Sequence, residues 1–282
     1  MMAERTNKTS LTIYYIILAV FTIFYVLPFY VTISTSFKPF EEVSISNMWK
    51  LPSKLSFEGF KEAFARLGPN LKNSFYLTIP ATLISAIIGS INGFALSKLR
   101  FKYSNIVFAL ILFGMFIPYQ SVLFPLIQFF QAIGLYGTIP ALIITHVIYG
   151  IPITTLMFKN YYEEIPNELV EASSVDGASI WQSYTKILLP ISMPGFVVVI
   201  IWQFTNIWNE FLFAVTITSD PTKQPITVAL VNLAGSQVVQ WNVQMAGALI
   251  AALPTLIVYI ILGRYFVRGL LAGSVKGQNK PA

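Results

Sequence analysis

The chain has 282 residues, of which 55% are hydrophobic and 11% are charged, and its formal net charge is +6. A soluble domain carries roughly 25% charged residues, so this composition excludes an ordinary soluble domain and predicts a protein embedded in lipid. The chain contains no cysteine, which excludes disulfide bonds and thiolate metal sites. It also lacks a basic cluster with interleaved aromatic residues, so no nucleic acid partner is predicted.

The first apolar segment runs from Thr9 to Phe37, over 29 residues without a charge. A secretory leader has an apolar core of about 7–15 residues, so this segment is predicted to be a membrane span. A helix needs about 20 apolar residues to cross the hydrocarbon. The longest uncharged stretch, residues 103–158, is divided into two spans by the sequence 131–140, which contains two glycines and a proline. We predict six spans, over residues 11–35, 73–97, 105–130, 138–158, 188–209 and 244–263.

The predicted fold is therefore an all-α membrane protein, with residues 1–282 forming a single transmembrane domain of six helices. Several prolines lie inside the spans, Pro118 among them. Membrane helices tolerate such prolines when neighbouring groups satisfy the freed carbonyls, so each span is expected to continue through its prolines.

Six spans place both ends of the chain on one side of the membrane, and the distribution of Lys and Arg selects that side. The loop 98–104 carries three basic residues and no acid, and the tail after residue 263 carries four. The loop 37–72 is an exception with six basic residues, but it also holds four acids. We predict a multi-pass protein of the cell (inner) membrane, with both termini, the loop 98–104 and the loop 159–187 in the cytoplasm.

The loop 159–187 has five acids against two lysines, which breaks the positive trend of the cytoplasmic side. A short helix is predicted over 167–175, and Gly177 can adopt the left-handed conformation that ends it. Ser179, with Gln182 three residues later, is a capping-box pattern for a second helix. Charge and propensity alone leave two interpretations open. The loop is either a compact helix-turn-helix element that docks to another protein, or a solvated loop whose acids provide solubility.

The spacing in this loop resembles a known family. The pattern E-A-S-x-x-D-G-A begins at Glu171, and I-x-L-P begins at Ile187. Both fit the "EAA" cytoplasmic loop of binding-protein-dependent ABC import permeases, with Ser173 in place of the second alanine. Three other segments resemble the sugar-importing branch, specifically the second permease of a maltose-type pair: residues 36–42, 208–218 and 264–277.

The resemblance implies the permease subunit of an ABC importer for a sugar or related polyol. In the family, the EAA loop forms a cytoplasmic coupling helix between spans four and five, which sits in a cleft of an ATPase subunit. Glu171 is then expected to pair with a basic residue of that cleft. The implied docking residues are Glu171, Ala172, Ser173, Asp176, Gly177 and Ala178. The implied partners are a second six-span permease, two ATPase subunits and an extracellular or periplasmic solute-binding protein.

No catalytic or cofactor site is predicted on this chain. It has no G-x-x-x-x-G-K-[ST] loop to hold phosphates, so ATP and Mg are expected on the partner ATPase subunits. His146 is the only histidine and is interpreted as a packing residue. The sequence shows neither a metal-ligand spacing nor a Ser–His–Asp set, so a membrane enzyme is disfavoured.

No Asp, Glu, Lys or Arg lies deep inside a predicted span. This absence argues against an ion-coupled secondary carrier and for an uncharged substrate. Polar residues recur on one face of the fifth span, where they would line a sugar path or, equally, hydrogen-bond between helices. The candidate path residues are Tyr149, Trp202, Gln203, Asn206, Trp208 and Glu210.

The outer loop 210–243 is either a plain linker or, as in maltose-type relatives, a segment that reaches the solute-binding protein. The candidate contacts are Asn232, Gly235, Gln237 and Gln240. Because the EAA loop is shared within the wider family, an importer for amino acids or peptides stays an alternative.

Overall fold

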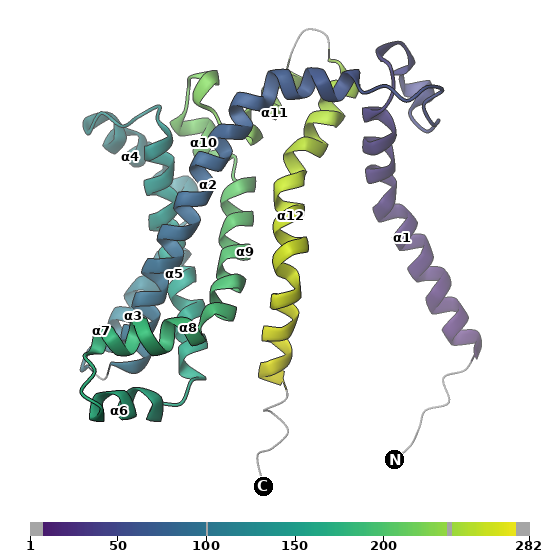
Figure 1. Ribbon diagram of the computed structural model, residues 1–282. Coiled ribbons are helices and arrows are strands. Elements are labelled where there is room, and N and C mark those ends of the chain that lie inside the picture. Colours follow the sequence, from purple (N-terminus) through teal and green to yellow (C-terminus); the bar gives the residue numbers. More distant parts are fainter. Residues whose placement is uncertain (1–7, 100, 236–238, 275–282) are drawn as a thin grey trace. The chain divides into compact units, whose positions relative to one another are not determined.

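The computed structural model describes residues 8–99, 101–235 and 239–274, and every regular element among them is a helix (Figure 1). The predicted all-α membrane protein is confirmed. Four of the described helices are long and apolar enough to cross a membrane: α1 (Lys8–Ser36), α2 (Glu58–Lys98), α5 (Ile139–Glu163) and α12 (Trp241–Ser274).

The third predicted span differs from expectation, because residues 105–130 are not one continuous helix. Helix α3 (Ser104–Phe113) and a single 3-10 turn (Gly114–Phe116) are followed by α4 (Tyr119–Ala132), whose axis is turned by 94°. Pro118 disfavours helical backbone at the residue before it, and Ile117 is extended, with φ −75° and ψ 116°.

The fifth predicted span, residues 188–209, also contains a bend. A helical segment from Ile180 to Ile191 meets α9 (Met193–Asn209) at an angle of 74°. Pro194 lies in the first turn of α9, where its missing N–H leaves no hydrogen bond unmade. The count of six spans stays a prediction, since it requires each bent pair to act as one span.

The remaining elements are short. The loop after α5 forms α6 (Glu168–Val175), α7 (Ile180–Ser183), a π-helix η4 (Tyr184–Leu188) and α8 (Leu189–Ile191). After α9 come α10 (Leu212–Ile217) and α11 (Ile226–Ala234).

The chain divides into two compact units, and α2 and α12 contribute to both. The first unit comprises residues 1–68 and 230–252, and the second comprises residues 69–229 and 253–282. The core of the second unit has two apolar clusters, one around Phe130 and Leu142 and the other around Phe158 and Leu188.

Within the second unit, α2 and α5 cross at close range through Gly89 and Gly93. A Cβ atom on Gly89 would lie 2.3 Å from Thr154 Oγ1, and one on Gly93 would lie 2.7 Å from the backbone nitrogen of Lys159. This pair is a G-x-x-x-G pattern, which lets membrane helices approach backbone to backbone. The crossing holds α5, which lines the cavity described below, against α2.

Candidate functional site

The segment from Asn167 to Ile191 forms a helical hairpin, called the hairpin below. Helix α6 is followed by Gly177, two residues after its end, whose φ of 82° is in the left-handed region. The Ala178 N–H donates to the Ser173 carbonyl (2.9 Å) and the Gly177 N–H to the Ser174 carbonyl (3.1 Å). These two bonds form a Schellman motif, so the predicted glycine turn is confirmed.

The predicted capping box that starts α7 is also present. Ser179 Oγ accepts from the Gln182 N–H at 3.3 Å, and Gln182 Oε1 accepts from the Ser179 N–H at 2.8 Å. Two backbone donors at the helix start are thereby satisfied within four residues. The turn between the helices is therefore held by local bonds at both of its ends.

One predicted docking residue lies elsewhere than expected. Ser173 is buried, and its Oγ is 2.7 Å from Ser183 Oγ and donates to the Val170 carbonyl. It therefore joins α6 to α7 instead of contributing to the outer surface. A small residue is needed here because the two helices approach each other at this point.

The exposed surface of the hairpin combines acids with large apolar side chains. Of the other predicted docking residues, Ala178 is half-buried and the rest are exposed: Glu171, Ala172, Asp176 and Gly177. Val175 is 88% exposed, Ile180 61% and Trp181 59%. Exposed apolar groups of this size mark contact surfaces. These three residues were not predicted as contacts from the sequence, although their position beside the acids in a short loop was a usable signal.

The base of the hairpin is attached to the end of α2 by Lys98. Its Nζ donates to the Ile165 carbonyl and, at 2.9 Å, to Asn167 Oδ1. Burial lowers the pKa of Lys98, and the nearby carboxylates of Glu163 and Glu168 oppose that shift. In the sequence, Lys98 indicated only the orientation of the chain in the membrane, and the structure adds this anchoring role.

A cavity of about 390 Å³ lies between the 3-10 turn before α4 and the helices α5, α9 and α10. Five of the six predicted path residues line it: Tyr149, Trp202, Gln203, Asn206 and Glu210. Gln203 packs over Gly150, where a Cβ atom would lie 2.0 Å from its Nε2.

Trp208, the sixth predicted path residue, is a packing residue. It is 2% exposed, with its ring centroid 4.9 Å from that of Phe75 and stacked at 5.6 Å on Phe204. The physical reason is helical geometry, because Trp208 follows Asn206 by two positions, about 200° around α9. It therefore points away from the face that Gln203, Asn206 and Glu210 share.

His146 and Glu210 lie together at one side of the cavity, with His146 Nε2 at 3.7 Å from Glu210 Oε2. The carboxylate of Glu210 accepts from the N–H groups of Phe213 (2.8 Å) and Ala214 (3.3 Å) and so caps α10. The His146 ring meets Phe213 edge-on at 5.8 Å. Within the described residues, no group of three His, Asp or Glu side chains is placed to hold a metal ion.

The candidate binding-protein contacts lie in the first unit. Asn232 and Gly235 are exposed near the end of α11, and Gln240 lines a second cavity, of about 420 Å³, together with Glu58 and Lys61. Gln237 falls outside the described residues.

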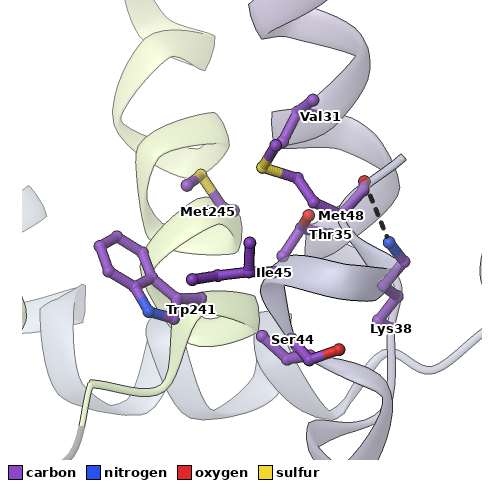
Figure 2. Close-up of a pocket in the computed structure, with 9 residues that line it drawn as sticks. Val31, Thr35, Lys38, Ser44, Ile45, Met48, Trp241 and Met245 are labelled. Carbon is purple, nitrogen blue, oxygen red and sulfur yellow. Dashed lines mark hydrogen bonds between the residues drawn. The ribbon is translucent and has the colours of Figure 1, made fainter. Parts of the chain in front are cut away.

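The same unit contains a third, mostly apolar pocket of about 390 Å³, shown in Figure 2. Trp241 and Met245 of α12 face Ile45 across it. Lys38 is 1% exposed, and its Nζ donates to the carbonyls of Asn47 (2.8 Å) and Met48 (3.4 Å). The ammonium group of Lys38 is therefore engaged in hydrogen bonds to backbone carbonyls of the same unit.

The chain is similar to known proteins in both sequence and fold. The family described as "Binding-protein-dependent transport system inner membrane component" matches residues 85–271. A probable ABC transporter permease protein of Pyrococcus horikoshii is 49% identical, over 97% of this chain and all of that protein. The xylose/arabinose import permease protein of Haloferax volcanii is 36% identical, over 91% of this chain and 90% of that one. A solved bacterial ABC transporter involved in alginate import has a chain with TM-score 0.82 at 20% identity, covering 94% of this chain and 99% of that one.

Proposed function

Since the chain belongs to the binding-protein-dependent transport system inner membrane components, a family of ABC transporter permeases, we propose that it forms part of the path by which a sugar or related polyol enters the cell. As a permease, it is a transport subunit and not an enzyme. Permeases of this family work with separate ATPase subunits. We propose that this chain pairs with a second six-span permease, two ATPase subunits and an external solute-binding protein.

The observation that carries the proposal is the exposed surface of the hairpin. Glu171 stands on α6 beside apolar groups of high exposure, Val175 among them. We propose that this surface enters a cleft of an ATPase subunit, where Glu171 meets a cation and the apolar groups are buried. Movement of the ATPase would then reach this chain through the hairpin.

The contacts of α2 support opposite locations for the hairpin and the loop 218–225. Lys98 holds the hairpin, while Asn70 Nδ2 donates to the Gln224 carbonyl at 2.8 Å. The two anchors lie 28 positions apart on α2, which is about 42 Å. The hydrocarbon is about 30 Å thick. With the hairpin and both termini in the cytoplasm, as the basic residues predict, the loop 218–225 is external.

The cavity supports a substrate rich in hydroxyl groups. Tyr149, Trp202 and Asn206 offer aromatic faces, a phenol and an amide, which suit stacking and hydrogen bonding. Glu210 also lines the cavity, but its carboxylate oxygens are engaged at the start of α10. A relative named for xylose and arabinose import points to the same substrate class.

The docking proposal is tested by Glu171→Lys, with Glu164→Lys as the control, an exposed glutamate just before the hairpin. We expect Glu171→Lys to abolish ATP-driven uptake and to weaken co-purification of the ATPase subunits, while the amount of permease in the membrane stays unchanged. Glu164→Lys should retain most of both. Unchanged uptake by Glu171→Lys would contradict the docking role.

The substrate proposal is tested with the assembled complex in vesicles that contain ATP. Labelled xylose, glucose and a polyol are compared with a labelled amino acid. Accumulation of a sugar or polyol that depends on ATP and on the binding protein is expected. Accumulation of the amino acid alone, or uptake that follows an ion gradient without ATP, would overturn it.

A further inference from the structure

Four buried hydroxyl groups, one of them from Tyr184 of the hairpin, form a connected cluster, called the hydroxyl cluster below. Ser90 Oγ lies 2.7 Å from Tyr162 Oη and 2.9 Å from Tyr184 Oη, and Tyr162 Oη lies 3.2 Å from Ser192 Oγ. None of the four residues is more than 3% exposed. The cluster joins four elements: α2, α5, the π-helix η4 and the bend before α9.

The cluster is well suited to hold these elements at fixed separations. A buried hydroxyl without a partner is costly, and here each hydroxyl has at least one partner inside the cluster. The tyrosine rings are themselves confined, since Tyr162 stacks on Phe158 and the centroid of Tyr184 is 5.1 Å from that of Phe94. A satisfied buried network of this kind makes its surroundings rigid.

Bonds inside the hairpin hold its helices together. Helices α6 and α7 are joined by the bond between Ser173 and Ser183, and the capping box of Ser179 fixes the start of α7. Tyr184 follows Ser183 directly and begins the π-helix, a rare local structure that often occurs at functional positions. The Tyr184 hydroxyl is therefore connected to α6 through adjacent residues of the hairpin.

Beyond the cluster lie the helices that line the cavity. Tyr162 belongs to α5, which carries Tyr149, and Ser192 marks the 74° bend from which α9 starts towards Trp202. We propose, building on the proposed function, that the hydroxyl cluster transmits movement of the hairpin to α5 and α9 and so to the cavity. Tyr184, Ser90, Tyr162 and Ser192 are positioning residues for transport.

The primary test is Tyr184→Phe, which removes one hydroxyl and leaves Ser90, Tyr162 and Ser192 bonded to one another. The control is Tyr136→Phe, which removes a hydroxyl that donates to the Thr216 carbonyl at 3.2 Å, a bond between residues outside the hairpin and the cluster. ATP hydrolysis and sugar uptake are measured on the same reconstituted complex. We expect sugar transported per ATP to fall by about threefold to tenfold in Tyr184→Phe, the range that one lost hydrogen bond supports, and to stay unchanged in Tyr136→Phe.

A purely structural role would give another result. If hydrolysis and uptake fall in proportion, the sugar transported per ATP is unchanged. An unchanged amount of sugar per ATP in Tyr184→Phe would overturn the proposal. Ser192→Ala provides a second variant should Tyr184→Phe not assemble, since Tyr162 keeps its bond to Ser90, and the same fall in the ratio is expected. Failure of the proposed function is distinguished by the unaltered complex, which would then show no ATP-driven sugar uptake at all.

Discussion

The hairpin and the cavity lie in the same compact unit, yet their shapes have different origins. In the hairpin, the bonds that fix the turn join residues no more than ten positions apart, such as Ser173 and Ser183. The cavity combines side chains of α5 and α9, which the whole hairpin separates along the chain. Damage to the hairpin should therefore stay local, whereas damage to the buried packing behind the cavity should lower the stability of the unit.

The largest effect is expected from the two tryptophans of α9, which form a matched pair. Trp208 is buried, and Trp202 is 50% exposed at the cavity. Trp208→Ala should lower the free energy of unfolding by about 3–5 kcal/mol. Trp202→Ala should leave the thermal unfolding midpoint in detergent nearly unchanged and raise the substrate concentration needed for half-maximal uptake. Equal loss of stability in the two variants would contradict their assignment to core and cavity.

A somewhat smaller effect is expected at the crossing of α2 and α5. Gly93→Leu places a side chain against the backbone of Lys159, which cannot move aside, and should cost about 3 kcal/mol of stability. Gly68→Leu is the control on the same helix, because nothing lies within 4 Å of a Cβ atom there. Thermal unfolding of both variants measures the difference, and a stable Gly93→Leu protein would show that the crossing is looser than described.

The turn of the hairpin should respond more weakly. Gly177→Val forces a β-branched residue into left-handed backbone, which costs about 1–2 kcal/mol. Gly177→Asn should be tolerated, because asparagine adopts that conformation more readily. We expect Gly177→Val to lower ATP-driven uptake without changing the unfolding midpoint of the bundle. A lower midpoint would show that the hairpin and the bundle unfold together.

The smallest effect is expected from the bond between the two helices of the hairpin. Ser173→Ala removes the contact with Ser183, at a cost of about 1 kcal/mol. Ser174→Ala removes only an exposed bond to the Val170 carbonyl within the same helix. Hydrogen exchange should become faster in α6 for Ser173→Ala and change little for Ser174→Ala. Identical hydrogen exchange in the two variants would contradict the claim that Ser173 joins α6 to α7.

Sequence reasoning predicted those parts of the site that depend on near neighbours. The left-handed turn at Gly177 and the capping box of Ser179 and Gln182 follow from residues within one helical turn. The shared face of Gln203 and Asn206 follows from helical spacing alone. The error at Trp208 came from selecting a residue for its chemistry without placing it around the helix.

The length and apolar character of the spans, and the local turns between them, were determined by the sequence itself, because hydrophobic patterning and backbone preferences act over a few residues. The hydroxyl cluster and the walls of the cavity were decided by the tertiary structure. Each of these depends on which distant helix packs alongside. A single sequence does not show which helices pack together, because the packing energy depends on both contacting surfaces and not on either segment alone.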